Sequence, residues 1–225
     1  LALGAVIVQG ILGGITVLYF LPPAVSIAHA SLAQLFFCLT VSLALFTSPG
    51  WKNPAEAGGY RPPASAVAGG YRPPACAVAT AENGLPLFPL ALATTAAVYV
   101  QLILGAATRH AVLGVLPHLL GALVVTGLGL GAAARVLRRH SALPALRRPA
   151  VLMGALVLAQ IFLGLGSYVV KYMREEIQPL PLTVTVTTAH VACGALVLAA
   201  ALVLTLRARL LLGAARAAKM SVGAG

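Results

Sequence analysis

Three of the five histidines, His29, His118 and His190, are the side chains best suited to chemistry in this sequence. Each lies between five and eight residues after the start of a long apolar run. At a rise of about 1.5 Å per residue, the three lie about 8 to 12 Å below the same membrane surface. Two imidazoles at one depth on neighbouring helices can bind the two faces of one heme iron. The spacing therefore predicts a heme site, with histidines that only make interhelical hydrogen bonds as the alternative.

Other polar residues lie near the ends of these runs. Arg109 and His110 lie in the loop before the second of these histidines, where they either face solvent or contact the anionic propionates of a heme. His140 lies among arginines at the opposite side, and we expect it to be solvated. Small residues about one turn after a histidine, such as Gly121 and Gly194, are expected to leave room for a flat macrocycle. The chain has no Asp and its four glutamates lie in loops, so no carboxylate acid or base is expected in the membrane.

Six apolar runs position these residues, and each is long enough to cross a bilayer, which takes about 20 residues. Of the 225 residues, 60% are hydrophobic and 8% are charged, whereas a soluble domain needs a polar surface. The sequence predicts an all-α, polytopic membrane helix bundle that contacts the lipid bilayer. The runs cover residues 1–20, 24–47, 85–107, 112–136, 149–171 and 182–206.

Positive charge divides the segments between these runs into two classes. The loops after the second and fourth runs and the tail after the sixth are rich in Arg and Lys, and the other loops are poorer. By the positive-inside rule, the basic segments and both ends of the chain are cytoplasmic, and the histidines lie toward the outer face. The net charge of +11 is thus interpreted as a topology signal, not as a nucleic-acid interface.

Two repeats organise the chain. Residues 59–69 and 70–80 are near copies within a Pro-rich and Gly-rich stretch, which predicts a cytoplasmic linker over 48–84. A Q-x-x-L-G motif begins at Gln9, Gln101 and Gln160, and each copy is followed by a run with a histidine near its start. The repeated unit is therefore a helix pair, with one pair over 1–47 and two more over 85–209, before a tail over 210–225.

Several of these segments resemble the heme A synthase family of cytochrome oxidase assembly proteins. They are VQGILGGITVLYFLPPAVSIAHASLAQLFF (8–37), QLILGAATRHAVLGVLPHLLGALVV (101–125), AQIFLGLGSYVV (159–170) and PLPLTVTVTTAHVACGALVL (179–198). The resemblance implies an inner-membrane protein of bacteria with eight helices in two pseudo-repeated four-helix halves. It implies that heme O, the substrate, is oxidised at a methyl group to the formyl group of heme A.

The resemblance also assigns roles to single residues. His118 and His190 match the ligands of a bound heme b in the C-terminal half, and His29 matches one ligand of the substrate heme. The family's first two helices, with another histidine and a catalytic glutamate, would precede Leu1. We therefore expect an N-terminally truncated chain, with six of eight helices, that does not make heme A alone. Heme O synthase, oxidase assembly factors and further copies of the chain are the partners that the resemblance implies.

Two other functions compete with this interpretation. A membrane cytochrome b-type protein that only transfers electrons would use the same histidine pair. A transporter built on repeats predicts broken helices and polar groups at mid-membrane, and the sequence contains few of these.

Overall fold

The computed structural model describes residues 2–52, 86–173 and 180–222, and the side chains of 2–51, 86–171 and 181–212. In these ranges the chain is helical and contains no strand. The duplicated segment over 59–80 and all four glutamates lie outside the described residues. The elements are α1 (Ala2–Leu18), α2 (Pro23–Thr47), α3 (Pro49–Lys52), α7 (Leu87–Arg109), α8 (Val115–Arg139), α9 (Pro144–Tyr168), the π-helical turn η1 (Val169–Met173) and α10 (Leu180–Val222).

Five of these helices, α2 and α7 to α10, are long and apolar enough to cross a membrane. The helical membrane bundle expected from composition is thus confirmed at this level. The first apolar run forms α1, which has 17 residues and is shorter than the other five. The sixth span and the division into two repeated halves remain predictions. Helix α10 runs through Val222, beyond residue 210, where the sequence predicted the start of a tail.

Local sequence explains where the helices begin. Pro23 and Pro144 lie in the first turns of α2 and α9, where the backbone N–H that proline lacks would have no helical partner. The turn between α1 and α2 takes Phe20 and Leu21 through φ values of 54° and 61°, which reverses the chain within a few residues. Non-glycine residues seldom adopt this left-handed conformation, so the turn is held at some cost by the packing of the two helices.

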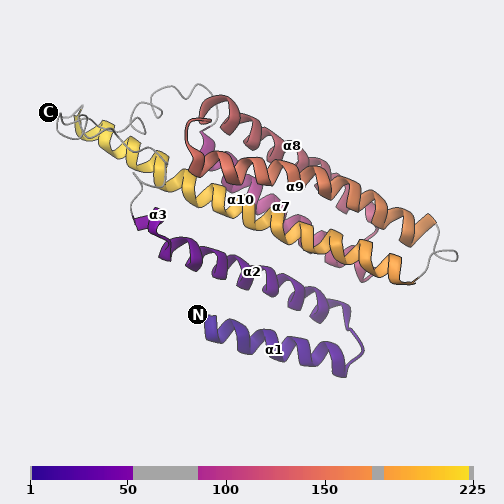
Figure 1. Cartoon of the computed structure of the whole chain (residues 1–225). Coiled ribbons are helices and arrows are strands. Elements are labelled where there is room, and N and C mark those ends of the chain that lie inside the picture. The colour runs from indigo at the N-terminus through magenta and orange to yellow at the C-terminus, as the bar shows by residue number, and fades with distance from the viewer. Residues whose placement is uncertain (1, 53–85, 174–179, 223–225) are drawn as a thin grey trace.

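Helices α7 to α10 form a four-helix bundle in which α7 packs against α8 and α10, and α9 packs against the same two helices. Helix α2 lies along α7 and α10 on one side of this bundle, and α1 packs on α2 at the edge of the molecule (Figure 1). We name the two ends of the bundle by their residues. The histidine end is where α7 ends at Arg109 and α8 begins at Val115, and the arginine end is where α8 ends at Arg139 and α9 begins at Pro144.

The buried core of the bundle lies toward the arginine end. The buried residues of α8 fall between Gly129 and Val136, and those of α9 between Ala145 and Val157. Residues 115–128 and 158–168 of these helices contain no buried side chain, nor do residues 181–192 of α10. The half of the bundle that contains His118 and His190 is therefore the more loosely packed half.

His140 differs from the sequence prediction, because its side chain is only 2% exposed instead of solvated. It follows the last residue of α8, and its backbone N–H donates to the carbonyl oxygen of Val136 at 2.8 Å. Its own carbonyl oxygen accepts from the N–H of Leu143 at 3.0 Å, which turns the chain toward α9. The charge pattern marks the end of the helix but does not reveal that this turn folds its first side chain into the core.

Candidate functional site

Each of the three membrane histidines is held by a glutamine from the preceding helix. The glutamine Nε2 donates to the backbone carbonyl oxygen of the histidine and also lies 3.1 to 3.5 Å from a ring nitrogen. The pairs are Gln9 with His29, Gln101 with His118, and Gln160 with His190. The distances to the carbonyl oxygen are 3.1, 2.9 and 3.0 Å in that order. The same contact thus recurs in three helix pairs: α1 with α2, α7 with α8, and α9 with α10.

A glycine one helical turn after each glutamine lies directly against the imidazole ring. A Cβ atom placed on this glycine would lie 3.1 Å from the Cε1 atom of the histidine in all three pairs. That distance is shorter than ordinary van der Waals contact, so an alanine would press on the ring. The glycines are Gly13 for His29, Gly105 for His118 and Gly164 for His190. The motif therefore supplies a hydrogen-bond donor and, four residues later, a flat surface for the ring.

Two small residues that follow the histidines lie against the neighbouring helix. A Cβ atom on Gly121 would collide with Oε1 of Gln101, and one on Gly194 would lie 3.3 Å from Nε2 of Gln160 and 3.0 Å from Leu102. These glycines therefore make room for the neighbouring helix and its glutamine. That they also leave room for a macrocycle stays a prediction.

The structure brings His118 and His190 together. Their ring centroids are 6.3 Å apart, and the ring planes are inclined by 78°. They meet although His118 follows the start of α8 by three residues and His190 follows the start of α10 by ten, because α10 extends further at this end. His29, on α2, contacts Gln9 and Gly13 of α1 and is not a member of this ring pair.

Arg109 and His110 lie at the histidine end, just before the helix that carries His118. Arg109 is exposed as the last residue of α7, and His110 is half-buried and donates its backbone N–H to the carbonyl oxygen of Ala106 at 3.1 Å. Their contact with heme propionates stays a prediction. Within the described ranges, no three His, Cys, Asp or Glu side chains gather closely enough to hold a metal ion by themselves. A heme iron does not require this, because the porphyrin supplies its other ligands.

The sequence pattern showed that the three glutamines recur in a motif but did not predict a role for them. Only the packing of the helices shows that each glutamine donates to a histidine carbonyl oxygen and that the following glycine contacts the ring. The signal was present in the spacing, because a polar residue and a glycine four apart lie on one helix face. A buried polar group in a membrane must find an internal partner, which is the reason to expect such a pair.

The chain was compared with known protein families, curated proteins and solved structures, and none of them matches it. The resemblance to heme A synthases therefore depends on the segments quoted above. What the site can do follows from its own geometry.

Proposed function

We propose that this chain binds a heme within the membrane, with His118 and His190 as the residues that would hold its iron. The distance between the two rings carries the proposal. A metal–nitrogen bond to histidine is about 2 Å long and the ring centroid lies about 1 Å further, so imidazoles on opposite sides of one iron have centroids about 6 Å apart. The observed separation of 6.3 Å matches this value.

Two further observations support a fit between these residues and a heme. The Nδ1 atom of His190 is buried and has no hydrogen-bond partner among the described residues. This ring therefore has a nitrogen that is available to bind a metal ion. The half of the bundle around both histidines contains few buried side chains, because residues 115–128 of α8, 158–168 of α9 and 181–192 of α10 contain none. A region between helices with few buried side chains is compatible with the binding of a flat hydrophobic group.

The residues around the histidines have positioning roles in this proposal. Gln101 and Gln160 tie the two histidine-bearing helices to their neighbours through the carbonyl bonds. Gly105 and Gly164 allow each ring to lie against the facing helix. Such contacts hold a ligand in one orientation and tune the metal that it binds. A bound heme supplies one-electron redox chemistry.

The wider function that we propose is that of a heme A synthase-type protein. His29 has the same glutamine and glycine contacts as the other two histidines and lies outside their pair, which supports a role as one ligand of a second heme, the substrate heme O. An electron-transferring membrane cytochrome b is the second candidate. It would use the same histidine pair, whose ring centroids are 6.3 Å apart.

Absorption and electron paramagnetic resonance spectra of the protein, purified from heme-replete membranes, test the heme pair. We expect a low-spin, bis-histidine heme that is lost in His118→Ala and in His190→Ala and kept in the matched control His29→Ala. A protein without low-spin heme, or a spectrum that neither substitution alters, would overturn the proposal.

The ratio of heme to protein separates the two functions. After incubation with heme O, a synthase-type protein binds a second heme that His29→Ala removes. A single heme at saturation, with or without His29, favours the electron-transfer protein.

A further inference from the structure

Helices α1 and α2 form a third histidine pair that has no counterpart among the described residues. The pair of α7 and α8 packs against the pair of α9 and α10, which places the ring centroids of His118 and His190 6.3 Å apart. His29 is held by the same contacts, from Gln9 and Gly13, but the described residues include no fourth pair to face it. Its Nδ1 atom is buried and has no hydrogen-bond partner in the described part of the chain.

His29 lies on the side of α2 that faces away from the four-helix bundle. Ser31 and Cys38 mark the opposite side, because the carbonyl oxygen of Ser31 accepts from the hydroxyl of Tyr99 at 3.4 Å and Cys38 packs against the buried core. At about 100° per residue, His29 is about 200° from Ser31 and about 180° from Cys38 around the helix. A second ligand for His29 therefore does not come from helices α7 to α10.

An exposed apolar seam, which we call the α1 seam, runs along the helix that holds His29 in place. The seam consists of Leu3, Ile7, Gly10, Gly14 and Val17, all of them exposed. Their alternate spacings of four and three residues place them on one side of the helix and are typical of a contact between helices. A Cβ atom on either glycine would meet no described atom within 4 Å, and α1 lies at the edge of the molecule (Figure 1). Small residues in such a seam allow two membrane helices to approach closely.

The four-helix bundle shows what kind of partner fits this seam. A Cβ atom on Gly194 of α10 would lie 3.0 Å from the side chain of Leu102, the residue that follows Gln101 in α7. The position after the glutamine is thus where one helix pair meets the next. In α1 the position after Gln9 is Gly10, which belongs to the seam. The seam therefore fits another helix pair of the same kind, and a second copy of α1 and α2 is such a pair.

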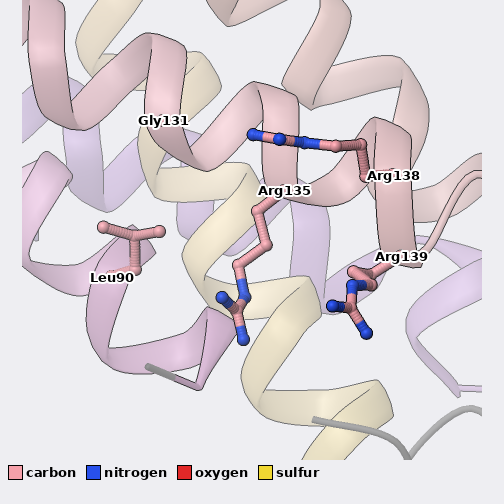
Figure 2. A pocket seen from close by; sticks show the side chains of 5 residues that line it. All are labelled: Leu90, Gly131, Arg135, Arg138 and Arg139. Carbon is pink, nitrogen blue, oxygen red and sulfur yellow. The ribbon is translucent and has the colours of Figure 1, made fainter. Parts of the chain in front are cut away.

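Charge distinguishes the α1 seam from the arginine end of the bundle. Helix α1 has no charged side chain between Ala2 and Leu18. The arginine end has a pocket of about 320 Å³ that three arginines of α8 line, together with Leu90 and Gly131 (Figure 2). Association of two chains through that end would involve charged groups and would depend on salt, whereas association through the α1 seam would not.

We propose that a second copy of this chain packs its α1–α2 pair on the α1 seam, so that His29 of each copy faces His29 of the other. The contact is symmetric, because each copy presents the same surface to the other. The two pairs form a four-helix unit of the kind that α7 to α10 form within one chain. This inference rests on the proposed function, because the two His29 side chains would hold the iron of the second heme. The second heme site is thus complete only in the dimer.

The mass of the detergent-solubilised chain, measured by analytical ultracentrifugation, tests the α1 seam as an interface. Gly10→Leu places a large side chain in the seam, where its Cβ meets no described atom of its own chain. Gly127→Leu, at an exposed glycine of α8, is the matched control. We expect the dissociation constant of the dimer to rise at least about tenfold in Gly10→Leu and to stay unchanged in the control and at high salt.

Three results would overturn this interface. A monomeric unaltered chain shows that lipid or another segment covers the α1 seam. A dimer that Gly10→Leu leaves intact places the contact elsewhere on the chain. A dimer that dissociates at high salt indicates a charged interface such as the arginine end.

The ratio of heme to protein tests the shared site. After incubation with heme O, we expect one heme at the His118–His190 pair of each chain and one more for every two chains. Gly10→Leu should lose only the shared heme, although its His29 is intact. A second heme in every chain, or none in the dimer, would overturn the shared site. A dimer that Gly10→Leu disrupts but that binds no heme refutes the proposed function and the shared heme, and it upholds the interface.

Discussion

The contact of Gly105 with the His118 ring makes a quantitative prediction for Gly105→Ala. The added Cβ would lie 3.1 Å from Cε1, and ordinary contact begins at 3.4 Å, so the ring must move by 3.4 − 3.1 = 0.3 Å. Metal–ligand distances tolerate about 0.2 Å. The required shift of the ring exceeds this tolerance, so the ring cannot both avoid the new Cβ atom and keep its distance to an iron. We therefore expect heme affinity to fall about tenfold. Gly164→Ala should act in the same way on His190, because its Cβ distance is also 3.1 Å.

The fold should survive this substitution. Overpacking of a well-packed contact costs about 1 to 3 kcal/mol. Replacing glycine by alanine inside a helix recovers about 1 kcal/mol. The free energy of unfolding should therefore fall by no more than about 2 kcal/mol, which a thermal melt followed by circular dichroism can measure.

Two matched controls separate the heme site from general strain. Gly13→Ala places a Cβ at the same 3.1 Å from His29, which lies outside the heme pair. Gly127→Ala adds a Cβ that meets nothing within 4 Å. Heme occupancy of the His118–His190 site and its low-spin signal should fall in Gly105→Ala and Gly164→Ala and stay unchanged in both controls. If Gly105→Ala retains the signal and occupancy of Gly127→Ala, the glycine does not position the ligand and the reasoning is refuted.

Two further predictions concern hydrogen bonds between helices. Gln101→Met removes the 2.9 Å bond to the His118 carbonyl and should cost about 1 kcal/mol of unfolding free energy and shift the heme midpoint potential. Gln9→Met, its control, should lower the unfolding free energy by the same amount without changing the heme midpoint potential. A change of midpoint potential in both variants would contradict the assignment of His118 as a heme ligand. Thr95 and Thr205 join α7 to α10 through their hydroxyls at 2.9 Å. A double-mutant cycle with valine should give a coupling of about 0.6 kcal/mol in detergent unfolding, and additive effects would disprove it.

The ends of the helices differ from the ends that the sequence pattern predicted. The apolar run that predicted α9 started at residue 149, whereas the helix starts at Pro144. The first five residues of α9 include Arg147 and Arg148. A search for apolar runs leaves these charged residues out, although arginine has a high helix propensity. His140 was placed wrongly for a related reason, because its burial depends on the turn that follows and not on its charged neighbours.

The sequence by itself determined that the chain forms long apolar helices, and it predicted a histidine near the start of three of them. Apolar runs of about 20 residues in a chain with few charges are typical of membrane helices. Position along a helix follows from residue number. Which helices lie side by side does not follow from residue number. Only the packing of α8, α9 and α10 brought His118 within 6.3 Å of His190 and left His29 with α1. Lateral neighbours depend on contacts between residues far apart in the chain, and those exist only after the helices associate.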